Sequence, residues 1–520
     1  MYKFAHDHIK ESAAALVPDN DTRKRLHLHI GQQLYQLSVD GVFVGSENQV
    51  EDRFLLLAVH HLNLGSIDEK EQKVELARLN CRAAVAAFKM FSFFAATEFL
   101  ERGLDMLDNA TRWDEDYDLT LRLTTTLAHI GSYCGQSDAT DKAVAEILEH
   151  ATCLKDKLGG YRSLSVNLSQ EGRDEEAMEI NLTVLEQLGV RIPQTFLKLN
   201  ILRLVLRVRR KLSHCTDEGL LALPEGMNES LLQAPPFISL SGGICASTGN
   251  AEYQALAVMQ FIFVTLKCNN RDWTPLAYAM AGCLYSHSGD ITTAHQYANL
   301  AYKAMDADSH PTLVSTRIVA ATHFSIFHWR KPCHQCLEGM LKAVKMASEI
   351  GKMQNLFLAT MGYFILYFHC KLQLGPLEKD MRQFGDMLQD YSQTYFFSIF
   401  QPQLQFFLNL MGQNADPTVL TGEVMDQEDY LRMLSKGRND RGRHLFHRNR
   451  MFLAYIFDDI ELAEDMASKL LSEGSTPGLA PRYLFEGLIA FRRRYRRKGW
   501  RDFSASWRSL FVSVMSTATI

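Results

Sequence analysis

Residues 278–301 read YAMAGCLYSHSGDITTAHQYANLA, and this stretch decides the fold that the sequence predicts. Its first half carries apolar and aromatic residues at helical spacing, with the small residue Gly282 among them. Gly289 and Asp290 then form a turn, and Asp290 can cap the helix that follows. Ala294, Ala298 and Ala301 place small residues where a neighbouring helix can approach closely. The stretch therefore predicts two antiparallel helices joined by a tight turn.

The same turn layout occurs elsewhere in the chain. Gly172–Ala177 and Asp458–Ala463 each begin with a turn residue, continue with acidic groups that can cap a helix, and place an alanine five positions on, as Gly289–Ala294 does. Residues 278–301 match the spacing of a tetratricopeptide repeat, a helix–turn–helix unit of about 34 residues. The other units match less well and are spaced irregularly. The sequence thus predicts a degenerate array of helical hairpins.

Composition supports a helical chain. Among 520 residues there are only 13 prolines and 31 glycines, the residues that break helices most effectively. Residues 78–107 carry apolar side chains at steps of three and four, and no stretch shows the sustained alternation of a strand. A helical hairpin cannot bury its apolar stripe alone, but stacked hairpins can. The predicted fold class is all-α, a TPR-like α-solenoid built as a superhelix of helical hairpins.

Charge and length exclude several classes of protein. The net charge is -5, so the chain has no overall cationic field for nucleic acid. The longest apolar stretches, residues 255–266 and 357–370, are shorter than the ~20 residues of a membrane span. The ten cysteines have no disulfide framework spacing, and residues 1–8 resemble no signal peptide. We expect a cytoplasmic protein without nucleic-acid partners.

Several motifs of enzymes are absent from the sequence. It contains no P-loop, no dinucleotide-binding glycine motif, no protein-kinase His-Arg-Asp or Asp-Phe-Gly, no Gly-x-Ser-x-Gly and no His-Glu-x-x-His. On this basis we predict a protein that is not an enzyme and has no catalytic residues, no cofactor and no metal site.

Two groups of residues have the chemistry of metal ligands. Cys333-His-Gln-Cys336 could be half of a zinc site or a redox pair, but no second ligand pair is spaced to complete it. We therefore favour two small residues on a helix. His60-His61 and the pair His27 and His29 could also be ligands, yet adjacent histidines face different sides of a helix. A place at the surface or packing in the core is the favoured role for these histidines.

Two further segments could have either a ligand-binding role or an ordinary structural role. The aromatic run Tyr363–Phe368 could line a ligand pocket, and we favour the core of a buried helix. The basic run Arg492–Lys498 could contact phosphate or anionic lipid. A solvated helix end is favoured there, because the rest of the chain shows no matching basic face.

Many small motifs, taken in order, resemble one family. They include Phe4-Ala-His6-Asp7, Leu26–Gly31, His61–Gly65, Glu75–Ala83, Phe99–Leu104, His328–Pro332, Glu349–Gly351, Gly375–Glu378, Asp416–Gly422 and Phe457–Ala463. Together they cover Tyr2 to about Arg494. This order is similar to the helical region that follows the Orc1-like AAA ATPase of large STAND-type signalling proteins. In that family a protein-kinase-like domain, the ATPase, this helical region and often a sensor histidine kinase share one chain.

The resemblance implies a site residue and a domain order. His6 matches the winged-helix histidine that contacts the β-phosphate of bound ADP in such ATPases, with Asp7 as its structural neighbour. The nucleotide-binding half precedes this region in the family, so helix packing is the favoured role of His6 here. The expected domains are the end of a winged-helix or linker region at 1–65, a first TPR-like subarray at 66–212, a connection at 213–236 that is indicated by its Gly, Pro and Asn content, a second subarray at 237–494 and a divergent basic tail at 495–520.

The implied function is a non-catalytic scaffold for protein–protein interaction and signal coupling. Its partners would be a protein or the neighbouring ATPase and kinase domains. The sequence departs from the family after about Arg494, so we expect the middle of a longer protein, either a truncated gene model or a remnant. One alternative is an ATP-binding or kinase signalling fragment. The other is a transcriptional regulator, which needs a basic helix-turn-helix that we do not find.

Overall fold

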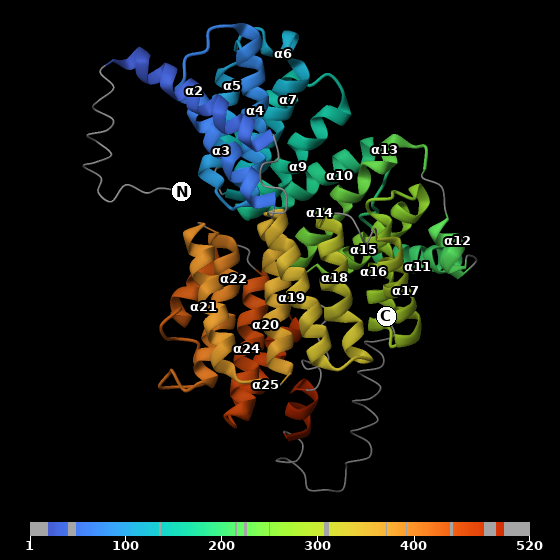
Figure 1. Ribbon diagram of the computed structural model, residues 1–520. Helices are drawn as coiled ribbons and strands as arrows, with labels where there is room; N and C mark the ends of the chain where they lie inside the picture. The colour runs from blue at the N-terminus through green and yellow to red at the C-terminus, as the bar shows by residue number, and fades with distance from the viewer. Residues whose placement is uncertain are drawn as a thin grey trace, which may run out of the picture. The chain divides into compact units, whose positions relative to one another are not determined.

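The structure is a computed structural model that describes residues 19–39, 48–134, 137–213, 216–222, 226–248, 250–305, 311–370, 372–391, 393–436, 440–472 and 485–492. Every regular element in these ranges is a helix, and they contain no β-strand (Figure 1). The predicted all-α class is confirmed. Residues 1–18, the first part of the proposed winged-helix or linker region at 1–65, lie outside the described residues.

The chain divides into two compact units, residues 1–164 and 165–520. The helices of the first unit are α2 (Asn20–Val39), α3 (Asn48–Leu64), α4 (Lys70–Lys89), α5 (Phe93–Asp105), α6 (Arg112–Glu115), α7 (Tyr117–Cys134) and α8 (Ser137–His150). Helix α9 (Leu154–Gln170) begins in the first unit and ends in the second. Sequential neighbours pack as hairpins in the first unit, with α2 against α3, α4 against α5 and α7 against α8.

The second unit continues from the end of α9. Its helices are α10 (Asp174–Gln187), α11 (Leu197–Ser213), α12 (Asp217–Leu221), α13 (Glu229–Leu232), α14 (Ala234–Ser247), α15 (Ala251–Cys268), α16 (Thr274–His287), α17 (Ile291–Ala304), α18 (Leu313–Ser325), the 3-10 turn η1 (Phe327–Trp329), α19 (Cys333–Ile350), α20 (Met353–His369), α21 (Leu374–Asp390), α22 (Thr394–Leu410), α23 (Gln427–Lys436), α24 (Asp440–Ile456) and α25 (Ile460–Ser472).

Helix contacts in the second unit follow the pattern of stacked hairpins. Helix α16 packs against its partner α17 and also against α18, the first helix of the next hairpin. Helix α18 repeats the pattern with α19 and α20 (Figure 1). Each hairpin therefore buries its apolar stripe on the next one, as a solenoid requires. The predicted array of helical hairpins is confirmed.

The three turns predicted from the sequence share one backbone geometry. Gly172, Gly289 and Asp458 each have a positive φ, of 79°, 83° and 67°. Each residue comes directly after the C-cap residue of a helix, and the backbone hydrogen bonds around it form a Schellman motif. At Gly289, for example, its amide donates to the Ser286 carbonyl at 3.1 Å, and the Asp290 amide donates to the Tyr285 carbonyl at 3.0 Å. The turn stops one helix by satisfying its last carbonyl groups.

The same turns also start the next helix and place its small residue. The Asp290 carboxylate accepts from the Thr293 amide at 3.0 Å and caps α17. The alanines five positions after each turn residue, Ala177, Ala294 and Ala463, are fully buried. A Cβ atom added at Gly282 would lie 3.0 Å from the Ala294 carbonyl oxygen. The small residues therefore permit the close approach of α16 and α17.

The aromatic run on α20 belongs to the core. Tyr363, Phe364 and Tyr367 are buried, and the Phe364 ring packs against Phe384 of α21 and Phe400 of α22 at centroid distances of 5.9 and 6.2 Å. The prediction of a buried helix is confirmed, because these rings pack against neighbouring helices on several sides.

The predicted domain boundaries remain predictions. The proposed connection at 213–236 contains the short helices α12 and α13, and the proposed tail at 495–520 lies outside the described residues.

Candidate functional site: an acidic groove along α10

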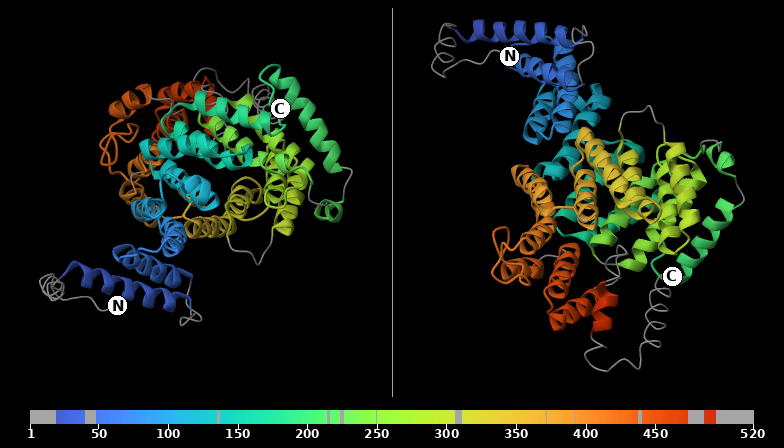
Figure 2. Two further views of the ribbon diagram at one scale, coloured as in Figure 1. Left: turned by 90° about the horizontal axis from the view of Figure 1, so that it is seen from above. Right: turned by 60° about the horizontal axis from the view of Figure 1, so that its bottom comes forward.

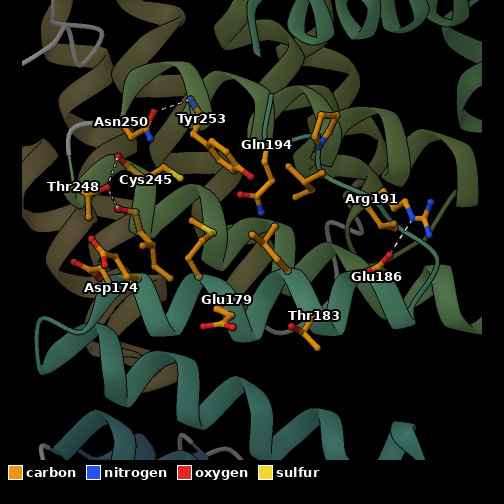
Figure 3. A pocket seen from close by; sticks show the side chains of 17 residues that line it. Asp174, Glu179, Thr183, Glu186, Arg191, Gln194, Cys245, Thr248, Asn250 and Tyr253 are labelled. Carbon is orange, nitrogen blue, oxygen red and sulfur yellow. Dashed lines mark hydrogen bonds and ion pairs between the residues drawn. The ribbon is translucent and has the colours of Figure 1, made fainter. Parts of the chain in front are cut away.

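A groove of about 1130 Å³ opens along one side of α10. Its other walls are residues 190–194, the end of α14 and the start of α15 (Figure 3). Apolar side chains supply much of the lining, namely Met178, Leu182, Val190, Ile192, Pro193 and Ile244. The groove therefore offers an apolar surface that is open to a partner rather than a sealed reaction chamber.

Helix α10 gives the groove its charge. Asp174, Glu175, Glu179 and Glu186 line it, and the three glutamates are exposed. Acidic residues in the first turn also favour α10 itself, since they face the positive end of the helix dipole. The Arg191 side chain is the cation of the lining, and its Nε lies 3.1 Å from the Glu186 carboxylate. Four carboxylates against one guanidinium make the groove acidic.

A further Schellman motif forms the end of the groove. The Gly189 amide donates to the Glu186 carbonyl at 3.0 Å, and the Val190 amide donates to the Leu185 carbonyl at 2.8 Å. Gly189 has a φ of 83°, and Val190 and Leu185 are both buried beside it. This turn ends α10 and directs Val190 and Ile192 into the apolar lining.

The opposite wall carries polar groups close to the apolar lining. The Asn250 carboxamide caps α15 by accepting from the Tyr253 amide at 3.1 Å, and the Thr248 hydroxyl donates to the Ile244 carbonyl at 3.1 Å. The Tyr253 hydroxyl oxygen is buried and has no hydrogen-bond partner among the described residues. Burial, and then the nearby Cys245, raise the pKa of the Tyr253 phenol. A neutral donor is therefore held at the groove without an acceptor (Figure 3).

The Cys245 thiol in the lining is buried, and its surroundings favour the protonated form. Burial, and then the charge of Asp174, raise the pKa of Cys245 to about 12. A thiol with that pKa stays protonated at neutral pH, and the thiolate is the reactive form. Asp174 itself accepts a hydrogen bond from the Ser169 hydroxyl at 2.7 Å. The geometry suits binding of a cationic segment with apolar side chains.

Sequence reasoning singled out Gly172–Ala177 only as a turn and missed this groove. A signal was present in part, because Glu175, Glu179 and Glu186 recur at helical spacing on one face of α10. The opposite wall, with Cys245 and Tyr253, comes from residues about seventy positions further along the chain, and no local pattern connects the two.

The candidate ligands named from the sequence have different outcomes. His6 and its neighbour Asp7 lie outside the described residues. Cys333 begins α19 and is half-buried, and Cys336 is buried in the same helix, so the prediction of two small residues on a helix is confirmed. Cys370, from the end of α20, joins them, and burial, followed by interactions with Cys333 and Cys336, raises its pKa to about 12. Within the described ranges, no three side chains of His, Cys, Asp or Glu are placed to hold a metal ion.

The structure brings together two histidines that sequence reasoning paired differently. His27 of α2 and His61 of α3 stack with ring centroids 5.0 Å apart, and their Nδ1 atoms lie 2.8 Å from each other. One ring must donate and the other accept across that distance. Burial, followed by the charges of His27 and His60, lowers the pKa of His61. The rings of His27 and His61 join the two helices of the hairpin, as packing side chains do, whereas His29 and His60 are exposed at the surface.

Only the first residue of the basic run 492–498 is described. The Arg492 guanidinium pairs with the Asp458 carboxylate and lies 5.1 Å from the centroid of the Tyr455 ring. Arg493 to Lys498 lie outside the described residues, so their contact with phosphate or lipid remains a hypothesis. Among the helices that the structure describes, none combines the length and the apolar character needed to cross a bilayer.

Comparison with known proteins gives a limited relationship. No family model matches the chain. Over 218 residues, 38% of this chain, the sequence is 21% identical to hybrid signal transduction histidine kinase G of Dictyostelium discoideum, and the match covers 6% of that protein. A solved structure described as a "circular tandem repeat protein with novel repeat topology and enhanced subunit contact surfaces" aligns over 96% of this chain and 98% of its own. That alignment has 12% identity and a TM-score of 0.12, too low to support any statement about the fold.

Proposed function

We propose that this chain is a non-catalytic helical-repeat scaffold that binds a partner protein through the acidic groove along α10. The partner segment would combine lysine or arginine with large apolar side chains. The observation that carries the proposal is the composition of the groove, four carboxylates around an open apolar lining. A cationic amphipathic helix would bury its apolar face there and keep its charges beside the glutamates.

The hydroxyl of Tyr253 adds a directional element to this binding. A buried donor without an acceptor is costly, and an acceptor supplied by a partner would remove that cost. The Tyr253 hydroxyl oxygen is itself covered, so a carbonyl or hydroxyl group of the bound segment could accept this hydrogen bond only after the covering side chains shift. The groove would then fix the register of the partner as well as its charge.

The link to signalling is supported by the partial similarity to a hybrid histidine kinase. In the finer form of the proposal, the scaffold lies beside a STAND-type ATPase and a sensor kinase and couples their states. Coupling requires that a partner bind one arrangement of the hairpins better than another, by a free energy of ~1–3 kcal/mol. The groove supplies a contact surface that such a rearrangement would change.

A pair of synthetic peptides tests the proposal. One is a helical peptide of leucine and lysine, and the other has the same leucines with glutamate in place of lysine. We expect the lysine peptide to bind, and the double variant Glu175→Lys, Glu179→Lys to weaken it by roughly tenfold or more. The matched control is Glu338→Lys, Glu349→Lys on α19, which changes the same charge at exposed positions away from the groove. Binding of the lysine peptide that the groove variant leaves unchanged, or an equal effect of both variants on that binding, would contradict the proposal.

The alternative of an ATP-binding fragment has a separate test. The groove does not favour a nucleotide, because its carboxylates repel a triphosphate and its arginine already faces Glu186. Calorimetry with magnesium and ATP on the full chain should show no binding heat. Saturable binding would favour the nucleotide alternative, whatever the outcome with the peptides.

A further inference from the structure

Helix α11 carries two apolar stripes on opposite faces. Leu204, Val208 and Leu212 recur every four residues, are buried, and face α15, the helix against which α11 packs. This first stripe attaches α11 to the second unit. In Figure 2 the helix lies along the outer edge of that unit. Its other face is directed away from the core.

The second stripe is exposed. Leu199, Leu202 and Leu206 recur at steps of three and four residues, and they are 46%, 55% and 58% exposed. Phe196, one turn before Leu199, is 80% exposed. Isolated exposed leucines need no explanation, but three on one helical face with a phenylalanine at its end form a contiguous patch.

Cations border this patch on both sides. Helix α11 contains six lysines and arginines and no acidic residue. By helical geometry, Arg203 and Arg207 lie on one flank of the leucine stripe, and Lys198 and Arg209 lie on the other. The guanidinium groups of Arg207 and Arg209 lie 5.9 and 5.8 Å from the rings of Phe263 and Tyr285. Hydrogen bonds from Thr293, and then the nearby charge of Arg209, lower the pKa of the Asp290 carboxyl. Lys198 has Glu252 at 3.4 Å, at a well-exposed position.

We propose that the outer face of α11 docks the second unit onto an anionic lipid surface. The helix would lie in the plane of the interface, with Phe196 and the leucines at the acyl boundary and the flanking cations among the headgroups. We choose a lipid surface as the partner because its charge is complementary to that of α11. The phosphates of a membrane surface would lie on both sides of the inserted leucine stripe, where the cations of the helix are. The inference goes beyond the scaffold function and is independent of the α10 groove.

Vesicle flotation with the full chain tests this assignment. The probes are vesicles of phosphatidylcholine alone and of phosphatidylcholine mixed with phosphatidylserine. We expect binding to the mixed vesicles at least roughly tenfold above the neutral ones, and weaker binding at high salt. The variant Arg203→Glu, Arg207→Glu should lower binding by roughly tenfold or more.

Variants of the leucine stripe separate insertion from charge attraction. Leu202→Glu, Leu206→Glu should abolish binding to mixed vesicles, and Leu202→Ala, Leu206→Ala should reduce it without adding charge. The matched control is Leu341→Glu on α19 combined with Leu431→Glu on α23, since these two leucines are 46% and 38% exposed and the charge change is the same. It should leave vesicle binding unchanged, and circular dichroism should show native helix content for all variants.

Two results would overturn the assignment. The first is wild-type chain that does not float with phosphatidylserine vesicles. If that chain instead binds the leucine and glutamate peptide through Leu202 and Leu206, the partner of α11 is an acidic protein segment. The second is a stripe variant that floats as well as wild type, which would leave the exposed leucines without a role in binding.

Discussion

A glycine between α18 and α19 offers a direct test of how the hairpins pack. Gly339 is buried within α19, and a Cβ atom added there would overlap the imidazole ring of His323 on α18. The ring cannot easily swing away, because its Nδ1 lies 3.0 Å from the Val319 carbonyl and 3.3 Å from the Tyr302 hydroxyl. Gly339→Ala therefore forces the helices or the ring to move.

The expected effect is the difference between two terms. Overpacking a close contact costs about 3 kcal/mol when several atoms overlap. Alanine gains about 1 kcal/mol over glycine in a helix interior. The net loss is about 2 kcal/mol, which corresponds to roughly 30-fold faster local opening. The matched control is Gly243→Ala in α14, where an added Cβ meets no atom within 4 Å, so that this variant should be stabilised.

Hydrogen exchange of peptides from α18 and α19 measures the effect locally, which suits a chain of two units better than one global unfolding midpoint. We expect the amides of α18 and α19 to exchange faster in Gly339→Ala than in the wild type. When His323→Ala is present as well, we expect no such loss of protection. Unchanged exchange in the single variant would refute the reasoning. An equal loss with and without His323 would also refute it, since the ring would then not be the obstacle.

The remaining predictions concern three side-chain groups. Because the pKa of His61 is lowered from 6.5 in the folded chain, the unfolded chain takes up that proton first. The contribution of neutral His61 to the stability of the α2–α3 hairpin should be complete above about pH 6.5 and should decrease as the pH falls below that value. Thermal melts of His61→Phe should lack this pH dependence. Glu146→Ala should lower the free energy of unfolding by about 1.5–3 kcal/mol, because the largely buried Arg112 guanidinium and the Trp113 indole, 2.6 and 2.7 Å from the Glu146 carboxylate, both lose their acceptor. In the control Glu115→Ala, which removes an exposed ion pair with Lys70, the free energy of unfolding measured by denaturation should change little. Iodoacetamide at neutral pH should label the exposed Cys153 and spare Cys245, and peptide mapping that finds Cys245 labelled would contradict its buried, protonated state.

Local features of the fold were predictable from neighbouring residues. Gly172, Gly289 and Asp458 mark turns because a helix end needs a residue that accepts a positive φ, and that requirement acts within a few positions. The burial of Tyr363–Phe368 was predictable for a similar reason, since a helix that is apolar on all sides must be covered. These constraints depend on sequence spacing alone.

The sites depend on contacts that spacing does not contain. The α10 groove needs Tyr253 and Cys245 opposite Glu179, and only packing of α10 on α14 brings those segments together. His27 and His61 meet because α2 and α3 fold back on each other. Helix α11 shows two apolar stripes in its sequence, but only the position of α15 decides which of the two is covered and which is open. The amino-acid sequence by itself determined where helices begin, end and turn, because those rules are local; the tertiary structure decided which faces meet, because burial depends on what lies across the contact.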